Sequence, residues 1–220
     1  MRILMILLGC AAMVFGNSSL YVSPQDPILK SVSSEVPLEE IPTTKIQGII
    51  DLMLELSIVE RNKGYMVGLA APQIGIPLQI ILVDTLISPE QKDFSHPLDV
   101  FINPKITWIS DEIEEYREGC YSTGTLSGKV PRSKQIRLEA YNRFGEMVEL
   151  EAEGYNARIF QHEVDHLNGL RFPDRMTNFN NLHWVEEDEI EEYRANYESW
   201  PKKCSKEDWL AYIHSSPADS

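Results

Sequence analysis

The segment 161–169 (QHEVDHLNG) contains two histidines and a glutamate that could carry out metal-assisted chemistry. On a helix, residues four apart lie on the same face, so His162 and His166 can both point at one ion. Imidazoles at this spacing suit a first-row divalent metal, and Glu163 lies beside them, where a carboxylate can exchange protons with a water on that ion. The alternative is a surface helix with two unrelated histidines. The spacing therefore predicts a metal site that still needs a third ligand.

The third ligand has three possible sources in this sequence. One large protease class places a third histidine six residues after the second, but that position is Phe172 here, which excludes the class. Another class uses a downstream glutamate. Glutamates at plausible distances are Glu186, Glu187 and Glu189. The last source is Cys120, although a lone cysteine is more often a small buried apolar group. These residues alone leave the glutamates and the cysteine open.

Apolar residues around the histidines repeat at helical spacing. Ala157, Phe160, Val164 and Leu167 would bury one side of a helix, and Gly169 is a natural stop just past its last turn. A second amphipathic helix is expected from candidate caps at residues 43–44 to about residue 60. Its expected apolar face consists of Ile46, Ile49, Ile50, Met53 and Leu54.

The remaining elements are expected to be short strands separated by turn-forming residues. They cover residues 79–84, 100–109, 135–141 and 146–151. The last two flank the turn sequence NRFG at 142–145, which favours a hairpin. The small, apolar segment 67–75, which contains Gln73, would let another backbone approach closely. We expect an α+β domain with short, mostly antiparallel sheets packed around the metal-binding helix.

Length and composition suit one domain with tails, since the chain has 220 residues and 43% hydrophobic content. The net charge of −14 argues against a protein that wraps nucleic acid phosphates or reads their sequence. The three cysteines, Cys10, Cys120 and Cys204, form no C-x-x-C pair, so a disulfide framework is not expected.

Both ends differ from the middle of the chain. Residues 1–19 form an apolar extension that is too short to span a bilayer and has the features of a signal segment, with a lipobox-like sequence ending at Cys10. Export or lipid anchoring through this segment is one expectation, and a dispensable extension of a cytoplasmic protein is the favoured one. Residues 177–220 carry an acidic run with interleaved aromatic residues, which we expect to form a solvated helix that lightly caps the domain.

Three stretches, taken together in their order and spacing, resemble the signature motifs of peptide deformylases. They are GLAAPQ at 68–73, EGCYS at 118–122 and QHEVDH at 161–166. The resemblance extends from about Val22 to Met176, so we expect a deformylase domain at 20–176 between the two extensions. Residues 130–132 and 157–159, with the long loop at 88–97, are most similar to the subgroup that includes mitochondrial deformylases.

The resemblance implies metal-dependent removal of the N-formyl group from the initiator methionine of nascent polypeptides, with release of formate. The implied metal ligands are Cys120, His162 and His166. Glu163 would take a proton from the attacking water and return it to the departing amine. The side-chain amide of Gln73 and the backbone N–H of Tyr121 would hold the oxyanion.

The resemblance also implies further roles around the centre. Gly68 would give backbone hydrogen bonds to an extended N-formylmethionyl peptide. The methionine pocket would be lined by Val67, Tyr155 and Ile159. Glu118 and Arg132 would form a supporting ion pair, and Asp165 would orient its surroundings without binding the ion. Met66 stands where the motif usually has glycine, which would narrow what passes there, and Tyr121 replaces a usual leucine or glutamate.

The resemblance implies ferrous iron, whereas the donor set also accepts zinc, nickel or cobalt. The expected partners are nascent chains close to the ribosome, which favours a cytoplasmic location. Two alternatives are a zinc endopeptidase with a downstream glutamate ligand and a deformylase-like binding protein without activity.

Overall fold

The computed structural model describes residues 20–62, 66–88 and 93–215 of the chain. The described part contains four α-helices, eight strands and several short 3-10 turns. The helices are α1 (Thr44–Arg61), α2 (Gly154–Leu167), α3 (Ile190–Asn196) and α4 (Lys206–His214). The apolar segment at 1–19, including Cys10, lies outside the described residues. None of the helices described is long and apolar enough to cross a membrane.

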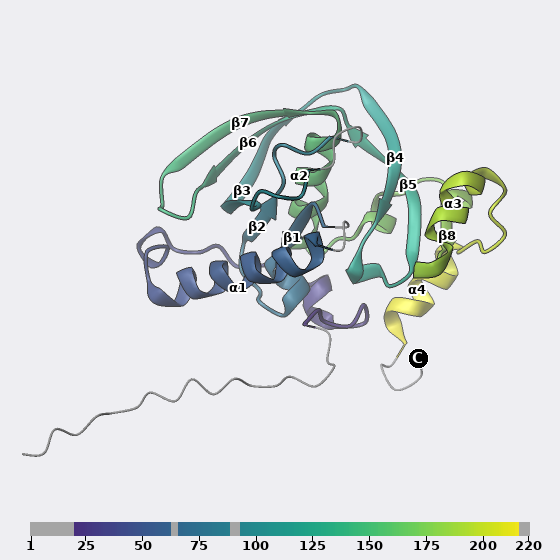
Figure 1. The fold of residues 1–220 in the computed structure, drawn as a ribbon, viewed down its shortest axis with the longest axis horizontal. Coiled ribbons are helices and arrows are strands. Elements are labelled where there is room, and N and C mark those ends of the chain that lie inside the picture. The colour runs from purple at the N-terminus through teal and green to yellow at the C-terminus, as the bar shows by residue number, and fades with distance from the viewer. Residues whose placement is uncertain (1–19, 63–65, 89–92, 216–220) are drawn as a thin grey trace, which may run out of the picture.

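Two antiparallel sheets form the body of the molecule (Figure 1). The five-stranded sheet has the order β1-β2-β3-β6-β7, and the three-stranded sheet has the order β4-β5-β8. The strands of the larger sheet are β1 (Gly68–Ala70), β2 (Ile80–Val83), β3 (Asp99–Ile109), β6 (Gln135–Tyr141) and β7 (Met147–Glu153). Those of the smaller sheet are β4 (Ile113–Gly119), β5 (Leu126–Ser133) and β8 (Leu182–Trp184). The predicted α+β class and the hairpin of β6 and β7 are confirmed.

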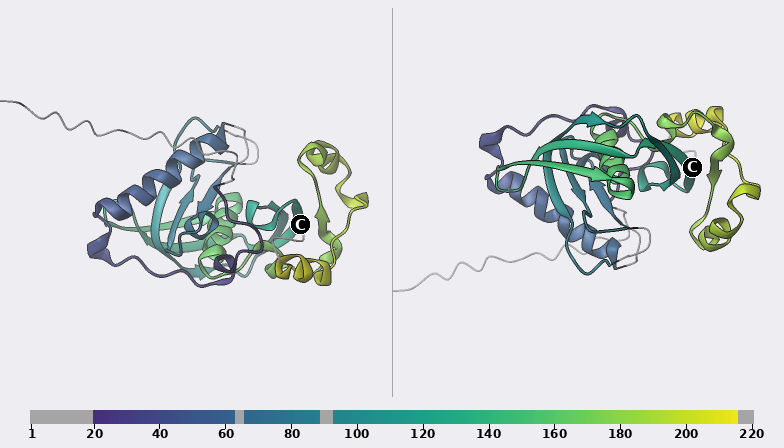
Figure 2. Two further views of the ribbon diagram at one scale, coloured as in Figure 1. Left: turned by 90° about the horizontal axis from the view of Figure 1, so that it is seen from below. Right: turned by 90° about the horizontal axis from the view of Figure 1, so that it is seen from above.

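Strand β2 of the larger sheet is buried on both faces because helices cover it from opposite sides. In β2, Ile80 and Leu82 pack into the hydrophobic cluster shared with α1, whereas Ile81 and Val83 pack into the cluster shared with α2. Successive residues of a strand point to opposite faces, so an uninterrupted apolar strand of this kind needs cover on both. Figures 1 and 2 show α2 enclosed by the strands, which places the predicted metal-binding helix at the centre of the domain.

Both predicted helices are present, α1 with the expected bounds, and the residues of their expected apolar faces are buried or partly buried. Thr43 caps α1, since its hydroxyl oxygen accepts a hydrogen bond from the N–H of Ile46 at 3.4 Å. In α2, Ala157, Phe160 and Leu167 are buried against the larger sheet. The helix ends at Leu167, and the backbone turns away at Gly169 with φ +70°.

The C-terminal segment is more closely integrated than the expected solvated helix. β8 adds to the edge of the smaller sheet by pairing Leu182–Trp184 with Leu126–Gly128 of β5. Within the acidic run, Tyr193, Tyr197 and Trp200 form a buried cluster. Trp209 of α4 is 1% exposed. The expectation was wrong because the many carboxylates point to solvent, while the interleaved aromatic side chains bury the opposite side of the same segment.

A buried ion pair ties the end of α1 to the strands that follow. Arg61 Nη1 donates to Asp84 Oδ2 at 2.7 Å and to the carbonyl of Met66 at 3.3 Å, and both charged side chains are at most 2% exposed. His96 contacts the other carboxylate oxygen at 2.8 Å. Burial alone would raise the pKa of Asp84, but the hydrogen bonds from His96 and Arg61 outweigh it and lower that pKa.

We predict that Asp84→Asn lowers the free energy of unfolding at pH 7 by about 3–5 kcal/mol, because it leaves the Arg61 cation buried without its partner. Since the folded-state pKa of Asp84 is lowered, this stabilisation is present above the unfolded-state pKa of about 3.9 and is lost as the pH falls below it. Denaturant unfolding of both proteins from pH 7 to pH 3 measures this difference. The exposed pair Arg137–Glu151 gives the control, since Glu151→Gln should change stability by less than about 1 kcal/mol. Equal effects of the two substitutions would contradict the prediction.

Candidate metal centre

Three ligand-type atoms from two distant parts of the chain meet beside α2. His162 and His166 come from successive turns of α2, and Cys120 lies between β4 and a 3-10 turn at 121–123. The Cys120 Sγ and His166 Nε2 atoms are 3.3 Å apart, and the two imidazole Nε2 atoms are also 3.3 Å apart. All three ligand atoms lie within 4.8 Å of one another. The structure therefore brings together the three residues that the sequence proposed as ligands.

The spacing of these atoms fits one shared metal ion. Tetrahedral zinc with bonds of about 2.0–2.1 Å to nitrogen and 2.3 Å to sulfur separates neighbouring ligand atoms by roughly 3.3–3.6 Å. In the part of the chain that the structure describes, no fourth Cys, His, Asp or Glu joins the group. Glu186, Glu187 and Glu189 are therefore not part of it, which removes the support for a downstream glutamate ligand. Three protein ligands are typical of a catalytic site, because one position stays available to water or substrate.

Glu118 holds the first imidazole in place. Its Oε2 atom accepts a hydrogen bond from His162 Nδ1 at 2.8 Å, which leaves Nε2 as the metal-facing atom. Arg132 donates to both carboxylate oxygens at 3.0 Å, and Arg158 donates to Oε1 at 2.7 Å. Although burial acts to raise the pKa of Glu118, His162 and Arg132 lower it well below its usual range. The expected contact between Glu118 and Arg132 is present, and Arg158 is a third member that the sequence analysis missed.

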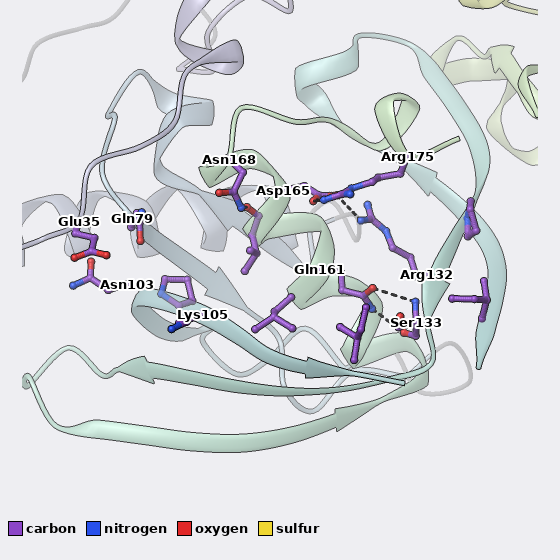
Figure 3. Close-up of a pocket in the computed structure, with 16 residues that line it drawn as sticks. Glu35, Gln79, Asn103, Lys105, Arg132, Ser133, Gln161, Asp165, Asn168 and Arg175 are labelled. Atoms are coloured by element: carbon purple, nitrogen blue, oxygen red, sulfur yellow. Dashed lines mark hydrogen bonds and ion pairs between the residues drawn. The ribbon is translucent and has the colours of Figure 1, made fainter. Parts of the chain in front are cut away.

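Asp165 extends this network away from the three ligand atoms. It forms ion pairs with Arg132 and Arg175, so its position agrees with the expected orienting role. A cavity of about 630 Å³ lies between α2 and strands β3 and β5. Figure 3 shows Asp165, Arg132 and Arg175 among the residues that line it. The cavity is lined by none of the three ligand residues, and Asp165 and Arg132 are already paired within it. Gln161 fixes α2 to β5 nearby by bonding both the N–H and the carbonyl of Ser133.

The second imidazole and the neighbouring carboxylate are deeply buried. His166 is 1% exposed, and burial lowers its pKa well below the usual value, which favours the neutral, ligating form. Glu163 is 4% exposed, and its Oε2 atom has no hydrogen-bond partner among the described residues. Burial raises the pKa of Glu163 to about 7. A carboxyl group with such a pKa can both accept and release a proton near neutral pH.

Gly68 on β1 makes room for that carboxylate. A Cβ atom at this position would lie 2.8 Å from the Cδ atom of Glu163, closer than real Cβ contacts allow. The same residue also sits at the edge of the larger sheet. Because the carbonyl of Val67 accepts from the N–H of Asp84 at 2.8 Å, the next residue, Gly68, turns its N–H and carbonyl away from β2.

The amide of Gln73 faces the centre in a fixed orientation. Its Oε1 atom accepts from the N–H of Ala70 at 2.7 Å, so its NH₂ group must point the other way. This group donates to Ser122 Oγ at 3.2 Å and lies 3.3 Å from Cys120 Sγ. Gln73 is therefore a hydrogen-bond donor beside the ligand sulfur.

Tyr121 begins the 3-10 turn after Cys120, and its side chain is 43% exposed. Its ring stacks on Tyr21 with centroids 4.5 Å apart, and its hydroxyl donates to Glu60 at 2.7 Å. The side chain thus joins three separate segments at the rim of the centre, a contact that the sequence alone did not indicate.

The apolar residues expected around the methionine pocket lie in one cluster. Ile159 is buried there, and Val67 and Tyr155 pack against it. Met66 was expected to narrow the path to this pocket, and this expectation was wrong. Its side chain is 4% exposed and packs into the other cluster, on the α1 side of the sheet. Met66 and Val67 immediately precede β1 and pack into different clusters.

Known proteins resemble this chain over most of its length. The profile of the family described as Polypeptide deformylase matches residues 21–181. A peptide deformylase of Bartonella tribocorum is 42% identical over 153 residues, which is 70% of this chain and 81% of that protein. A Met-Ala-Ser-bound structure of the class I type b peptide deformylase from Acinetobacter baumannii has a TM-score of 0.60 at 34% identity, covering 69% of this chain and 93% of that one. An actinonin-bound structure of the same enzyme has a TM-score of 0.61 at 32% identity, covering 71% and 97%.

We predict that Cys120→Ser lowers the affinity for a divalent metal by at least about tenfold, because the thiolate ligand is lost. Cys204→Ser is the matched control, since Cys204 is fully buried in an apolar cluster and burial raises the pKa of its thiol to about 12. This control should lose some stability and keep its metal. Metal content after dialysis against a chelator measures the effect. Full metal retention by Cys120→Ser would exclude the sulfur as a ligand.

Proposed function

This chain belongs to the polypeptide deformylase family, and we propose that Cys120, His162 and His166 hold the metal ion on which deformylation depends. As a member of this family, the chain is an enzyme that removes the N-formyl group from nascent polypeptides. The observation that carries the assignment of residues is the group of three ligand atoms within 4.8 Å, with Glu163 and Gln73 beside it. When bound, the divalent ion acts as a Lewis acid that lowers the pKa of water and polarises the formyl oxygen.

Glu163 is proposed to move the proton of the reaction. Its unpartnered Oε2 atom can accept a proton from the attacking water, and its pKa of about 7 allows the same atom to deliver that proton to the departing amine nitrogen. Burial keeps the carboxylate out of bulk solvent, so the proton passes between reacting atoms and one side chain.

Gln73 and Tyr121 are proposed to hold the oxyanion. The Gln73 amide has its carbonyl fixed by Ala70, so its N–H bonds keep their direction as charge develops on the formyl oxygen. The backbone N–H of Tyr121 belongs to the residue after Cys120, at the start of a turn that is closed by the hydrogen bond from Thr123 N–H to the Cys120 carbonyl. Donors held this way need no reorganisation during the reaction.

The proposed substrate is an N-formylmethionyl peptide that lies along the open edge of β1. A relative has been solved with Met-Ala-Ser bound, and an extended peptide could pair with the outward-facing N–H and carbonyl of Gly68. The methionine side chain would enter the apolar cluster at Val67, Tyr155 and Ile159. We further propose ferrous iron as the native metal, with zinc, nickel or cobalt as possible occupants, and action on chains close to the ribosome in the cytoplasm.

Formate release from formyl-Met-Ala-Ser by the iron- or nickel-loaded enzyme tests this proposal. We expect Glu163→Gln to lower kcat/KM by at least about 100-fold with the metal retained, because proton transfer is lost and no ligand is removed. Gln is matched to Glu in shape, so the fold should be unchanged. Activity within twofold of the wild type would remove Glu163 from its proposed role, and no formate from the loaded wild type would refute the function.

We also predict that Gly68→Ala lowers kcat/KM by about 100-fold, because the new methyl group pushes the Glu163 carboxylate out of position. The end of a glutamate side chain can move without disturbing the core, so the melting temperature should change by only a few degrees. Gly48→Ala in α1 is the control, since nothing lies within 4 Å of its Cβ position. Unchanged turnover in Gly68→Ala would show that Glu163 does not act from the observed position.

A further inference from the structure

Arg171 is a buried cation close to the loop that carries Cys120. It is 2% exposed, and no carboxylate forms an ion pair with its guanidinium within the described part of the chain. Its Nη1 atom donates to the carbonyl of Pro24 at 2.7 Å and, more weakly, to that of Ser122 at 3.4 Å. A buried cation is unfavourable unless negatively charged or electron-rich groups face it, so the surroundings of Arg171 must supply such groups.

The ring of Trp209 is one of these groups. The guanidinium carbon of Arg171 lies 4.6 Å from the ring centroid, and the indole N–H is held by Asp174 Oδ1 at 3.2 Å. The π face of an indole is the strongest aromatic partner for a cation, above all where water is excluded. Burial lowers the pKa of Arg171, and the negative charges of Asp174 and Cys120 oppose this shift. The cation therefore contacts both an aromatic ring of α4 and, through the Ser122 carbonyl, the loop that carries Cys120.

Other residues of α4 touch the same loop. A Cβ atom on Gly124, where φ is +65°, would collide with the hydroxyl of Tyr212. Cys120 itself packs against the apolar cluster that contains Trp209 and Ile213. Lys30 donates to the carbonyl of Ile213 at 2.8 Å and so fixes the last turn of the helix. Contacts from α4 thus hold the loop that carries the Cys120 sulfur. This helix lies beyond residue 181, where the match to the family ends.

We propose that Trp209 is a positioning residue of the metal centre, which acts by holding Arg171 against the loop 120–124. This inference rests on the proposed role of Cys120 as a ligand. A loop held on both sides keeps the sulfur within bonding distance of the ion, whereas a loosened loop lets the sulfur dissociate more often. Trp209 is not one of the three ligand residues and acts through Arg171, so its effect appears first in how long the metal is retained.

Cobalt-substituted full-length protein provides the test. Release of Co²⁺ to an excess of chelator and the sulfur-to-cobalt charge-transfer absorption are measured for the wild type, Trp209→Ala and Trp200→Ala. Trp200 is the matched control: it is the same residue type, buried in the same C-terminal segment, but it packs in a separate cluster with Tyr193 and Tyr197. We expect release to be about 10- to 100-fold faster in Trp209→Ala, with a weakened absorption. Trp200→Ala should stay within twofold despite lower stability, and Trp209→Phe should restore most of the retention.

Equal release from the two tryptophan variants, or no change in Trp209→Ala, would overturn the inference. If Trp209→Ala does not fold, Arg171→Met decides instead, because it removes the cation and keeps a long apolar side chain. Faster release from Arg171→Met supports the positioning role, and unchanged release overturns it. A wild type that binds Co²⁺ without any sulfur-to-cobalt absorption would refute the proposed ligand set itself.

Discussion

The hydrogen bond between His162 Nδ1 and Glu118 Oε2 is the interaction on which the centre depends. It fixes the plane of the imidazole and leaves Nε2 directed at the other two ligand atoms. Glu118 remains ionised while buried because His162 and Arg132 lower its pKa, and Arg158 donates a further hydrogen bond to it. Arg132 in turn needs Asp165 as a second partner. The orientation of one imidazole is thus set by a network of buried charges, and loss of any member would leave its neighbours with fewer partners.

The fold gives the metal centre both a buried helix and an open strand edge. Burial of α2 between the larger sheet and β5 removes water from Glu163 and His166, and this burial moves their pKa values in the directions that proton transfer and ligation require. Burial of the helix does not close the site, because β1 is an edge strand. Gly68 contributes to both features. It lacks the side chain that would displace Glu163, and its backbone N–H and carbonyl face the open edge of the sheet.

Local patterns in the sequence were sufficient to predict α1, α2, the hairpin and the three ligand candidates. Each depends on residues that are close in the chain or on motifs specific enough to identify the family. Arg158 was missed because its partner Glu118 lies 40 residues away in the sequence, and only the fold brings them together. The C-terminal segment was mistaken for a solvated helix because its carboxylates outnumber the aromatic residues that bury it. Met66 was misplaced because the motif shows which residue replaces the usual glycine but not toward which face of the sheet its side chain packs.

The order in which the chain is synthesised gives the contact between α4 and the cysteine loop a further consequence. Domains begin to fold while the ribosome is still adding residues, and α2 and the strands from β1 to β7 are complete by residue 167. Trp209 and Tyr212, which back the loop at Cys120 and Gly124, are translated more than forty residues later. Under the positioning role proposed for Trp209, a nascent molecule gathers its two histidines before α4 can hold the loop of the cysteine. A product that terminates before α4 would then keep all three ligand residues but hold the sulfur less firmly.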